Sequence, residues 1–249
     1  MDSHIETVIH KKSGEKVEIN WFENTTSPDV TTPRLGEEWD SVDRGLASFV
    51  NSYIKSVNDS GIPFRLHSVT LDGYRTDSDG QKKAKDAALK FLEEVKERTG
   101  KVIVFYGSPG TGKTHLSCAI AKRMLLGGAK SVIYTTASQI ARDVRSTYTK
   151  NADTTEKAII AQLIGASLLV MDEVGVGLGT AHEQDMIQAV ISGRYDAMKP
   201  TVLVSNLKMD DLRQNLGDRL IDRIREDIGV MIEMAWESER KNKLRQATR

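Results

Sequence analysis

A glycine-rich segment that ends in lysine and threonine carries the strongest chemical signal in this sequence. Its residues are Gly107, Ser108, Pro109, Gly110, Thr111, Gly112, Lys113 and Thr114, and His115 follows as part of the same candidate site. The GxxxxGK[ST] spacing is that of a phosphate-binding loop, because glycines let backbone N–H groups converge on phosphate oxygens and the helix that follows adds the positive end of its dipole. We therefore expect a nucleoside triphosphate site, with Lys113 on the β- and γ-phosphates and the Thr114 hydroxyl on Mg²⁺.

Two carboxylates at the end of an apolar run form the second chemical signal. Asp172 and Glu173 directly follow Leu168–Met171. A strand at this place carries both side chains to the edge of the sheet where α/β folds bind ligands. We expect Asp172 to belong to the Mg²⁺ shell and Glu173 to orient and deprotonate the attacking water. A water-activating base here distinguishes an ATPase from a nucleotide kinase.

A third polar side chain ends another apolar run. Asn206 follows Thr201–Ser205, so its amide is expected at the same sheet edge, within reach of the γ-phosphate or of the lytic water. Asparagine is also common after strands because it suits turns. The residues alone leave both interpretations open.

These side chains need a framework that brings strand ends together. Short apolar runs alternate with helical patterns, and the runs are Val102–Tyr106, Ser131–Thr135, Leu168–Met171, Val202–Ser205 and Val230–Met234. Helices are predicted over Ser78–Thr99 and His115–Leu126. Runs this apolar, separated by helices, predict an α/β domain whose mostly parallel sheet is covered on both faces.

The N-terminal part of the chain has a different pattern. Residues 1–23 alternate apolar and polar side chains around a Lys-Ser-Gly-Glu turn, which predicts a β-hairpin, and residues 24–36 form a polar linker with two prolines. From Glu37 to Asp59 apolar residues recur every three or four positions, which predicts an amphipathic helix that stops at Ser60–Pro63. Its apolar face either packs on the following domain or docks on a partner protein.

Composition restricts the environment and the partners. The 249 residues include 35 basic and 35 acidic ones, so any contact with DNA must come from a local patch rather than from the net charge. A single cysteine, Cys118, cannot form an internal disulfide, and its apolar neighbours predict a small buried residue. No apolar run is long enough for a membrane span and no secretory signal is present, so we expect a cytoplasmic protein without a membrane partner.

Several segments together resemble one protein family. GSPGTGKTHL, LLVMDEVGVG, TVLVSNL, LGDRLIDRIRE, LHSVTLDGYR and AWESER are similar to the DnaC/IstB branch of the AAA+ proteins, and most of all to the DnaC-type replicative helicase loaders of bacteria and phages. The likeness runs over residues 60–245. It implies an AAA+ P-loop NTPase domain at 60–249, with a parallel five-stranded sheet flanked by helices, and a small partner-binding extension at 1–59.

The same resemblance implies roles for further residues. Asn206 takes the place of the sensor 1 residue, and Arg240 takes that of sensor 2. Arg219 and Arg223 match the box VII arginines, with Arg223 as the arginine finger that reaches the ATP of a neighbouring subunit and Arg219 as its support. Without the resemblance, these two arginines are better explained as one face of a solvated helix with acidic partners.

A basic segment before the acidic pair is the candidate DNA contact. In the family the corresponding insertion helix lines the inner surface of a spiral oligomer and contacts single-stranded DNA. Arg142, Arg145, Tyr148 and Lys150 would then combine charges for the DNA backbone with a ring on which a base stacks. The alternative is an ordinary amphipathic helix with a basic face.

The function that the resemblance implies is that of an ATP- and Mg²⁺-dependent loader of a hexameric replicative helicase onto single-stranded DNA. It would act in replication initiation as an ATP-dependent spiral of identical subunits. The N-terminal segment departs from the family, because it lacks the cysteine-rich zinc module of some relatives and starts with a hairpin where the cellular loader's arm is helical. Two alternatives are an IstB-like helper of a transposase, acting on duplex DNA, and an adaptor that uses ATP only to set its shape.

Overall fold

The structure is a computed structural model that describes residues 4–10, 16–21, 39–41, 44–95, 100–149, 152–176, 180–225 and 229–238. Side chains are described from Ser48 on, Val50 excepted. The predicted linker at 24–36 and the predicted roles of Lys150 and Arg240 lie outside these residues. Within them, no helix is both long and apolar enough to cross a membrane.

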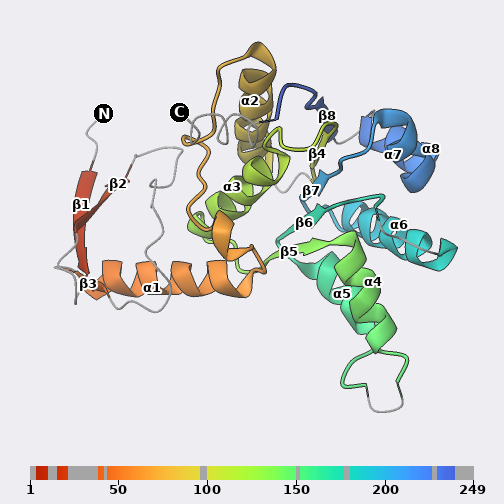
Figure 1. Ribbon diagram of the computed structural model, residues 1–249. Coiled ribbons are helices and arrows are strands. Elements are labelled where there is room, and N and C mark those ends of the chain that lie inside the picture. The colour runs from red at the N-terminus through yellow and green to blue at the C-terminus, as the bar shows by residue number, and fades with distance from the viewer. Residues whose placement is uncertain are drawn as a thin grey trace, which may run out of the picture.

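A five-stranded sheet forms the centre of the protein (Figure 1). In chain order its strands are β4 (Val102–Tyr106), β5 (Val132–Thr136), β6 (Leu168–Asp172), β7 (Thr201–Val204) and β8 (Gly229–Glu233). They lie in the order β5-β6-β7-β4-β8, and every neighbouring pair is parallel. Parallel pairing brings all carboxyl ends to one edge of the sheet. The predicted parallel five-stranded sheet is therefore confirmed.

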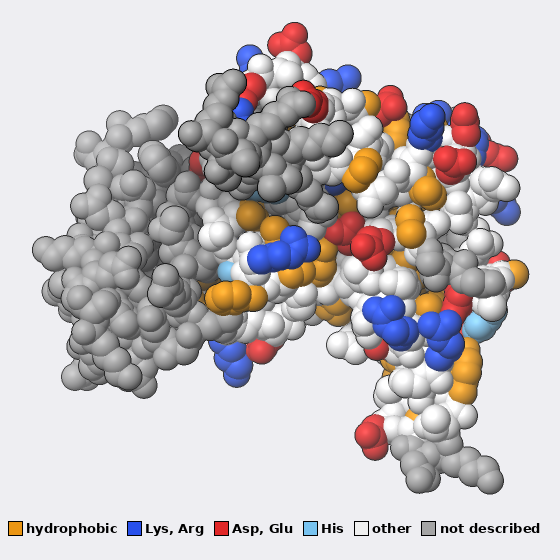
Figure 2. Space-filling model, viewed as in Figure 1, with side chains coloured by type: hydrophobic (Ala, Val, Ile, Leu, Met, Phe, Trp, Pro, Cys, Tyr) orange, Lys and Arg blue, Asp and Glu red, His pale blue; other side chains and the backbone are white. Residues whose placement is uncertain are grey.

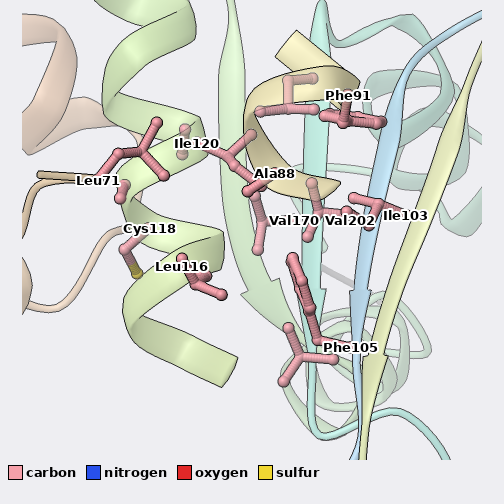
Figure 3. Packing of buried hydrophobic residues seen from close by; sticks show 14 of the residues in the cluster. Leu71, Ala88, Phe91, Ile103, Phe105, Leu116, Cys118, Ile120, Val170 and Val202 are labelled. Atoms are coloured by element: carbon pink, nitrogen blue, oxygen red, sulfur yellow. The ribbon is translucent and has the colours of Figure 1, made fainter. Parts of the chain in front are cut away.

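Helices cover both faces of this sheet (Figure 1). One face packs against α1 (Arg44–Asp59), α2 (Asp79–Glu94) and α3 (Lys113–Leu126). In Figure 3, Phe91 of α2 and Ile120 of α3 face the strand residues Ile103 and Val202. The other face packs against α4 (Ala137–Ser146), α5 (Glu156–Gly165), α6 (Ala181–Asp196), α7 (Met209–Leu216) and α8 (Asp218–Arg223). Strands β4, β6 and β7 are buried along their whole length because both faces are covered there, whereas β8 at one edge of the sheet is partly exposed.

Local side-chain signals set the starts of several helices. At α2 the Ser78 hydroxyl accepts from Gln81 N–H, and the Gln81 side chain accepts from Ser78 N–H, which is a complete capping box. Threonine hydroxyls accept in the same way before α4, α5 and α6, at Thr136, Thr155 and Thr180. Thr136 is also the last residue of β5, so α4 begins directly at a strand end.

The N-terminal segment forms a second, antiparallel sheet in the order β2-β1-β3. The predicted hairpin is present, since β1 (His4–His10) pairs with β2 (Lys16–Trp21). The helix expected from Glu37 begins only at Arg44, because β3 (Trp39–Ser41) pairs with β1 instead. The short strand satisfies its backbone groups across the sheet, which three-to-four-residue periodicity cannot reveal.

Helix α1 joins this small sheet to the central domain (Figure 1). Its end is buried in the core beside α3, where Tyr53 and Val57 are 4% and 1% exposed. This part of the apolar face therefore packs on the following domain. Gly61, with φ of +82°, turns the chain away after the helix. The division of the chain after residue 59, and the partner-binding role of residues 1–59, stay predictions.

Candidate nucleotide site

The glycine-rich loop joins β4 to α3 at the carboxyl edge of the sheet. Lys113, the first residue of α3, is buried, and its Nζ donates to the carbonyl oxygens of Gly107 (2.9 Å) and Ser108 (2.6 Å). These bonds close the loop around the ammonium group. They place a positive charge at the N-terminal end of a helix, where phosphate binding is favoured.

Two aromatic side chains from distant parts of the sequence bind the backbone of this loop at Thr111. Tyr74 Oη and Trp236 Nε1 both donate to the carbonyl oxygen of Thr111, at 3.2 and 3.1 Å. A Cβ on Gly112, whose φ is +94°, would lie 2.7 Å from the Tyr74 ring. This glycine of the motif is therefore required by packing as well as by access to phosphate.

The chain that leaves β8 crosses the same loop. Met234 N–H donates to Tyr106 O at 2.8 Å, which continues the pairing of β8 with β4. A Cβ on Gly107 would lie 2.9 Å from Met234 O, and one on Gly110 would lie 2.0 Å from Ser238 Oγ. The loop is thus contacted both by the segment before α2 and by residues 234–238.

The carboxylate at the end of β6 faces the start of α3. Asp172 is buried, and its Oδ2 accepts from the hydroxyls of Thr114 (3.0 Å) and Tyr134 (2.7 Å). Its Oδ1 accepts from the backbone N–H of Glu173 at 2.7 Å. A carboxylate and a hydroxyl side by side are oxygen ligands of the kind that Mg²⁺ prefers, so this pair fits the ion that the loop motif implies. The structure brings the two predicted metal ligands together although 58 residues separate them.

The predicted base and the predicted sensor lie at two adjoining strand ends. Glu173 is exposed and has φ of +57°, an uncommon and strained conformation for a residue with a side chain. The turn after it is tied to the end of β7, because Val174 N–H donates to Val204 O (2.9 Å) and Ser205 Oγ donates to Val174 O (2.7 Å). Asn206 follows at once. Since β7 lies between β4 and β6, Asn206 is placed between the loop and the acidic pair.

Four aromatic or imidazole side chains around the site have contacts that the motif does not predict. His115 Nε2 lies 2.8 Å from Thr70 O, so its ring binds the segment before α2, and its predicted contact with nucleotide stays a prediction. Tyr74 and Trp236 were not singled out from the sequence, although both lie in segments that carry the family resemblance. Tyr134 had no signal at all, because its contact depends on which strands are neighbours.

Arg219 and Arg223, the predicted box VII arginines, belong to the helix layer on the other face of the sheet. Arg219 and Arg223 border a hollow of about 300 Å³ lined by α6, α7 and α8. The acidic residues of the same helix bind elsewhere, since Asp218 and Asp222 accept from Arg213 at 2.8 and 3.0 Å. Glu226, the third acidic partner considered for these arginines, lies outside the described residues. The finger role of the two arginines and the alternative of a solvated helix face therefore both stay predictions.

The basic segment lies on α4 and in the turn after it. Arg142, Arg145 and Tyr148 recur every three residues and so share a face, and Figure 2 shows Lys and Arg side chains over the base of the lobe formed by α4 and α5. Arg145 forms an ion pair with buried Glu183 at 2.6 Å. The Tyr148 side chain is 60% exposed, and its hydroxyl lies 3.2 Å from Glu156 Oε2. An exposed ring with Arg145 nearby is compatible with nucleic acid.

Comparisons with known proteins agree on one family. The sequence profile described as IstB-like ATP binding protein matches residues 65–247. The chain is 32% identical over 186 residues to the replicative helicase loader DnaC of Escherichia coli (strain K12), which is 75% of each protein. The crystal structure of the DnaC helicase loader superposes with a TM-score of 0.61 at 22% identity, over 69% of this chain and 99% of that one.

A structure with bound nucleotide analogue gives a similar picture. AMPPCP-bound DnaA from Aquifex aeolicus superposes with a TM-score of 0.57 at 26% identity, over 76% of this chain and 57% of that one. The central domain superposes on this fold, and the chain itself carries the complete phosphate loop and the acidic pair. The chain belongs to the family of IstB-like ATP-binding proteins and is an AAA+ ATPase.

Proposed function

We propose that this ATPase loads a hexameric replicative helicase onto single-stranded DNA during replication initiation. The observation that carries the proposal is the 32% identity to the DnaC loader across three quarters of both chains. That stretch contains both the nucleotide site and the basic segment on α4. The protein would work in the cytoplasm as an ATP-dependent spiral of identical subunits.

The chemistry of ATP hydrolysis is assigned to residues at the sheet edge. Lys113 binds the β- and γ-phosphates, and Asn206 and Glu173 orient the attacking water, whose proton Glu173 accepts. Thr114 and Asp172 would hold Mg²⁺, which when bound neutralises charge on the phosphate oxygens. Glu173→Gln should abolish turnover but keep ATP binding. If loading continued unchanged in this variant, the protein would be an adaptor that uses ATP only for its shape.

The site is completed by a neighbouring subunit. Arg223 is proposed as the finger, and the face of the Tyr195 ring supports its guanidinium group at 4.7 Å. Arg213 fixes the short helix through both aspartates, which leaves Arg219 and Arg223 beside the hollow. An arginine finger supplies about 10³–10⁵ in rate, so isolated subunits should hydrolyse ATP poorly.

Mixed oligomers test the shared site. Glu173→Gln and Arg223→Ala subunits should each be inactive alone, but a 1:1 mixture should recover activity. About one interface in four then joins an intact Glu173 to an intact Arg223, if subunits mix at random in a head-to-tail assembly. ATPase activity that stayed absent at every mixing ratio would contradict a finger acting between subunits.

The basic segment is proposed to contact single-stranded DNA. Tyr148→Ala should weaken binding by about 5-fold to 150-fold, because one base–ring stack is worth about 1–3 kcal/mol. Tyr148→Phe is the matched control, since it keeps the ring and loses only the hydroxyl, with its contacts to Glu156 and His182. Equal loss in both variants would point to a local structural role. ATP binding should be unaffected in both.

The decisive experiment mixes the protein with the replicative helicase of its source, with and without ATP, and measures the mass of the complexes. Assembly on the helicase hexamer is expected, and a chain without residues 1–43 should fail to assemble while still binding ATP. The second candidate, a transposase helper, is favoured by the IstB-like profile. It predicts no helicase complex and instead ATP-dependent growth on duplex DNA.

A further inference from the structure

Tyr134 connects the acidic pair to the end of helix α1. It lies on β5, where it pairs with Val170 of β6, while Thr136 pairs with Asp172. Residues two apart on a strand point to the same face, so the long Tyr134 side chain can run along the sheet toward the strand end. Its hydroxyl reaches Asp172 Oδ2 at 2.7 Å.

The hydroxyl of Tyr134 acts as a donor in this contact. The ring is half-buried beside the α3 layer. A phenol hydroxyl has an O–H to donate, whereas an ionised carboxylate can only accept. A hydrogen bond from a neutral hydroxyl to a carboxylate is short and strong.

The backbone of the same residue is fixed by the turn after α1. Tyr134 N–H donates to Ser60 O at 2.7 Å, and a Cβ on Gly61 would lie 2.5 Å from Tyr134 O. Helix α1 itself is anchored by Tyr53 and Val57 in the same core. Tyr134 thus has little freedom to move, which is what a group that orients another side chain requires.

Thr114 and Tyr134 donate to the same oxygen of Asp172, but they are not equivalent. The Thr114 hydroxyl is itself a proposed metal ligand, so its contact with the carboxylate changes when the ion binds. The Tyr134 hydroxyl comes from a neighbouring strand and has no such second task. We propose that Tyr134 is a positioning residue, which holds the Asp172 carboxylate toward Thr114 and thereby sets the affinity of the site for Mg²⁺.

The inference rests on the proposed role of Asp172 as a metal ligand, and Tyr134→Phe tests it by removing one oxygen atom. The measurement is the binding of a fluorescent ATP analogue, first in EDTA and then during titration with Mg²⁺. In the variant, the Mg²⁺ concentration at the midpoint should rise about 10-fold to 100-fold, as is usual when a partner of a metal ligand is lost. Binding in EDTA should not change.

Two further variants make the result unambiguous. Tyr53→Phe removes a hydroxyl from another buried tyrosine of the same core, and its Mg²⁺ midpoint should equal that of the wild type. Asp172→Asn should remove the effect of Mg²⁺ altogether. If Asp172→Asn removes the effect of Mg²⁺ but Tyr134→Phe has the same Mg²⁺ midpoint as the wild type, then Tyr134 does not position the carboxylate. If Asp172→Asn leaves the midpoint unchanged, the proposed metal site is wrong, and this inference fails with it.

Discussion

Replacement of Arg194 by methionine is expected to destabilise the ATPase domain strongly. Arg194 lies near the end of α6 with no exposed surface, and its guanidinium group joins the end of α5 to the start of β7. It donates to five oxygens within the protein. These are the carbonyl oxygens of Leu163, Ile164, Ala166 and Pro200 and the hydroxyl of Thr201.

The size of the effect follows from these contacts. Three of the four carbonyls belong to the end of α5, where the helix offers them no backbone partner. Each buried acceptor without a donor costs about 1–3 kcal/mol. Burial removes water from the guanidinium group of Arg194 and lowers its pKa from 12.5 to about 10, which corresponds to a cost of about 3 kcal/mol. Methionine does not carry this cost, so the substitution regains about 3 kcal/mol of stability. Four carbonyl acceptors at this cost amount to about 4–12 kcal/mol, so a net loss of about 1–9 kcal/mol remains. The middle of this range agrees with the loss of about 3–5 kcal/mol for other disrupted buried charge networks.

Thermal and denaturant unfolding without nucleotide measure this loss. At roughly 2–4 °C per kcal/mol, Arg194→Met should lower the unfolding midpoint by about 10 °C. Arg194→Lys is the control, because lysine keeps the charge but has only three donors. Its unfolding midpoint should lie between those of the wild type and of Arg194→Met. A methionine variant within about 1 kcal/mol of the wild type would refute the reasoning, since the carbonyls would then have found other partners.

Three further predictions concern the loop and the core. Trp236→Phe removes the hydrogen bond to Thr111 O and should weaken ATP binding about 2-fold to 10-fold in a fluorescence titration. An unchanged affinity would show that this hydrogen bond does not stabilise the loop. Gly110→Ala should abolish ATP binding, because its φ is +80° and the added Cβ would meet Ser238; retained binding in calorimetry would show that the tail moves aside. Burial, followed by the charge of Asp172, raises the pKa of Cys118 to about 12, so the native thiol should resist alkylation at pH 8 until the protein unfolds, and fast labelling would contradict this burial.

The strands were predictable because of where they lie. A run such as Val102–Tyr106 is apolar at every position, which only a strand covered on both faces explains, and β4 has these bounds. The stretch Trp39–Ser41 was misassigned to a helix because Trp39 continues the spacing of the helix that follows, whereas its pairing with β1 involves residues far away in the sequence. Patterns within one segment do not report such pairings.

The same distinction between local patterns and contacts with distant segments applies to the residues of the candidate site. The phosphate loop and Asp172 were predictable because their chemistry requires fixed residue types beside a strand end. Tyr134 and Trp236 were not, because their roles depend on the order of the strands and on a chain crossing that no local pattern encodes. Tertiary contacts of this kind need the structure.

The hydrogen bond from Trp236 to Thr111 O has a consequence for the protein during its synthesis. Trp236 comes 125 residues after the carbonyl oxygen that it holds. At about 5–20 residues per second, a ribosome takes roughly 6–25 s to make that stretch. A nascent chain therefore carries the complete glycine-rich motif well before Trp236, which binds Thr111 O, has been added. Chains that stop just before Trp236 lack this hydrogen bond and should bind ATP more weakly, so the loop reaches its full affinity only after this late part of the fold has been made.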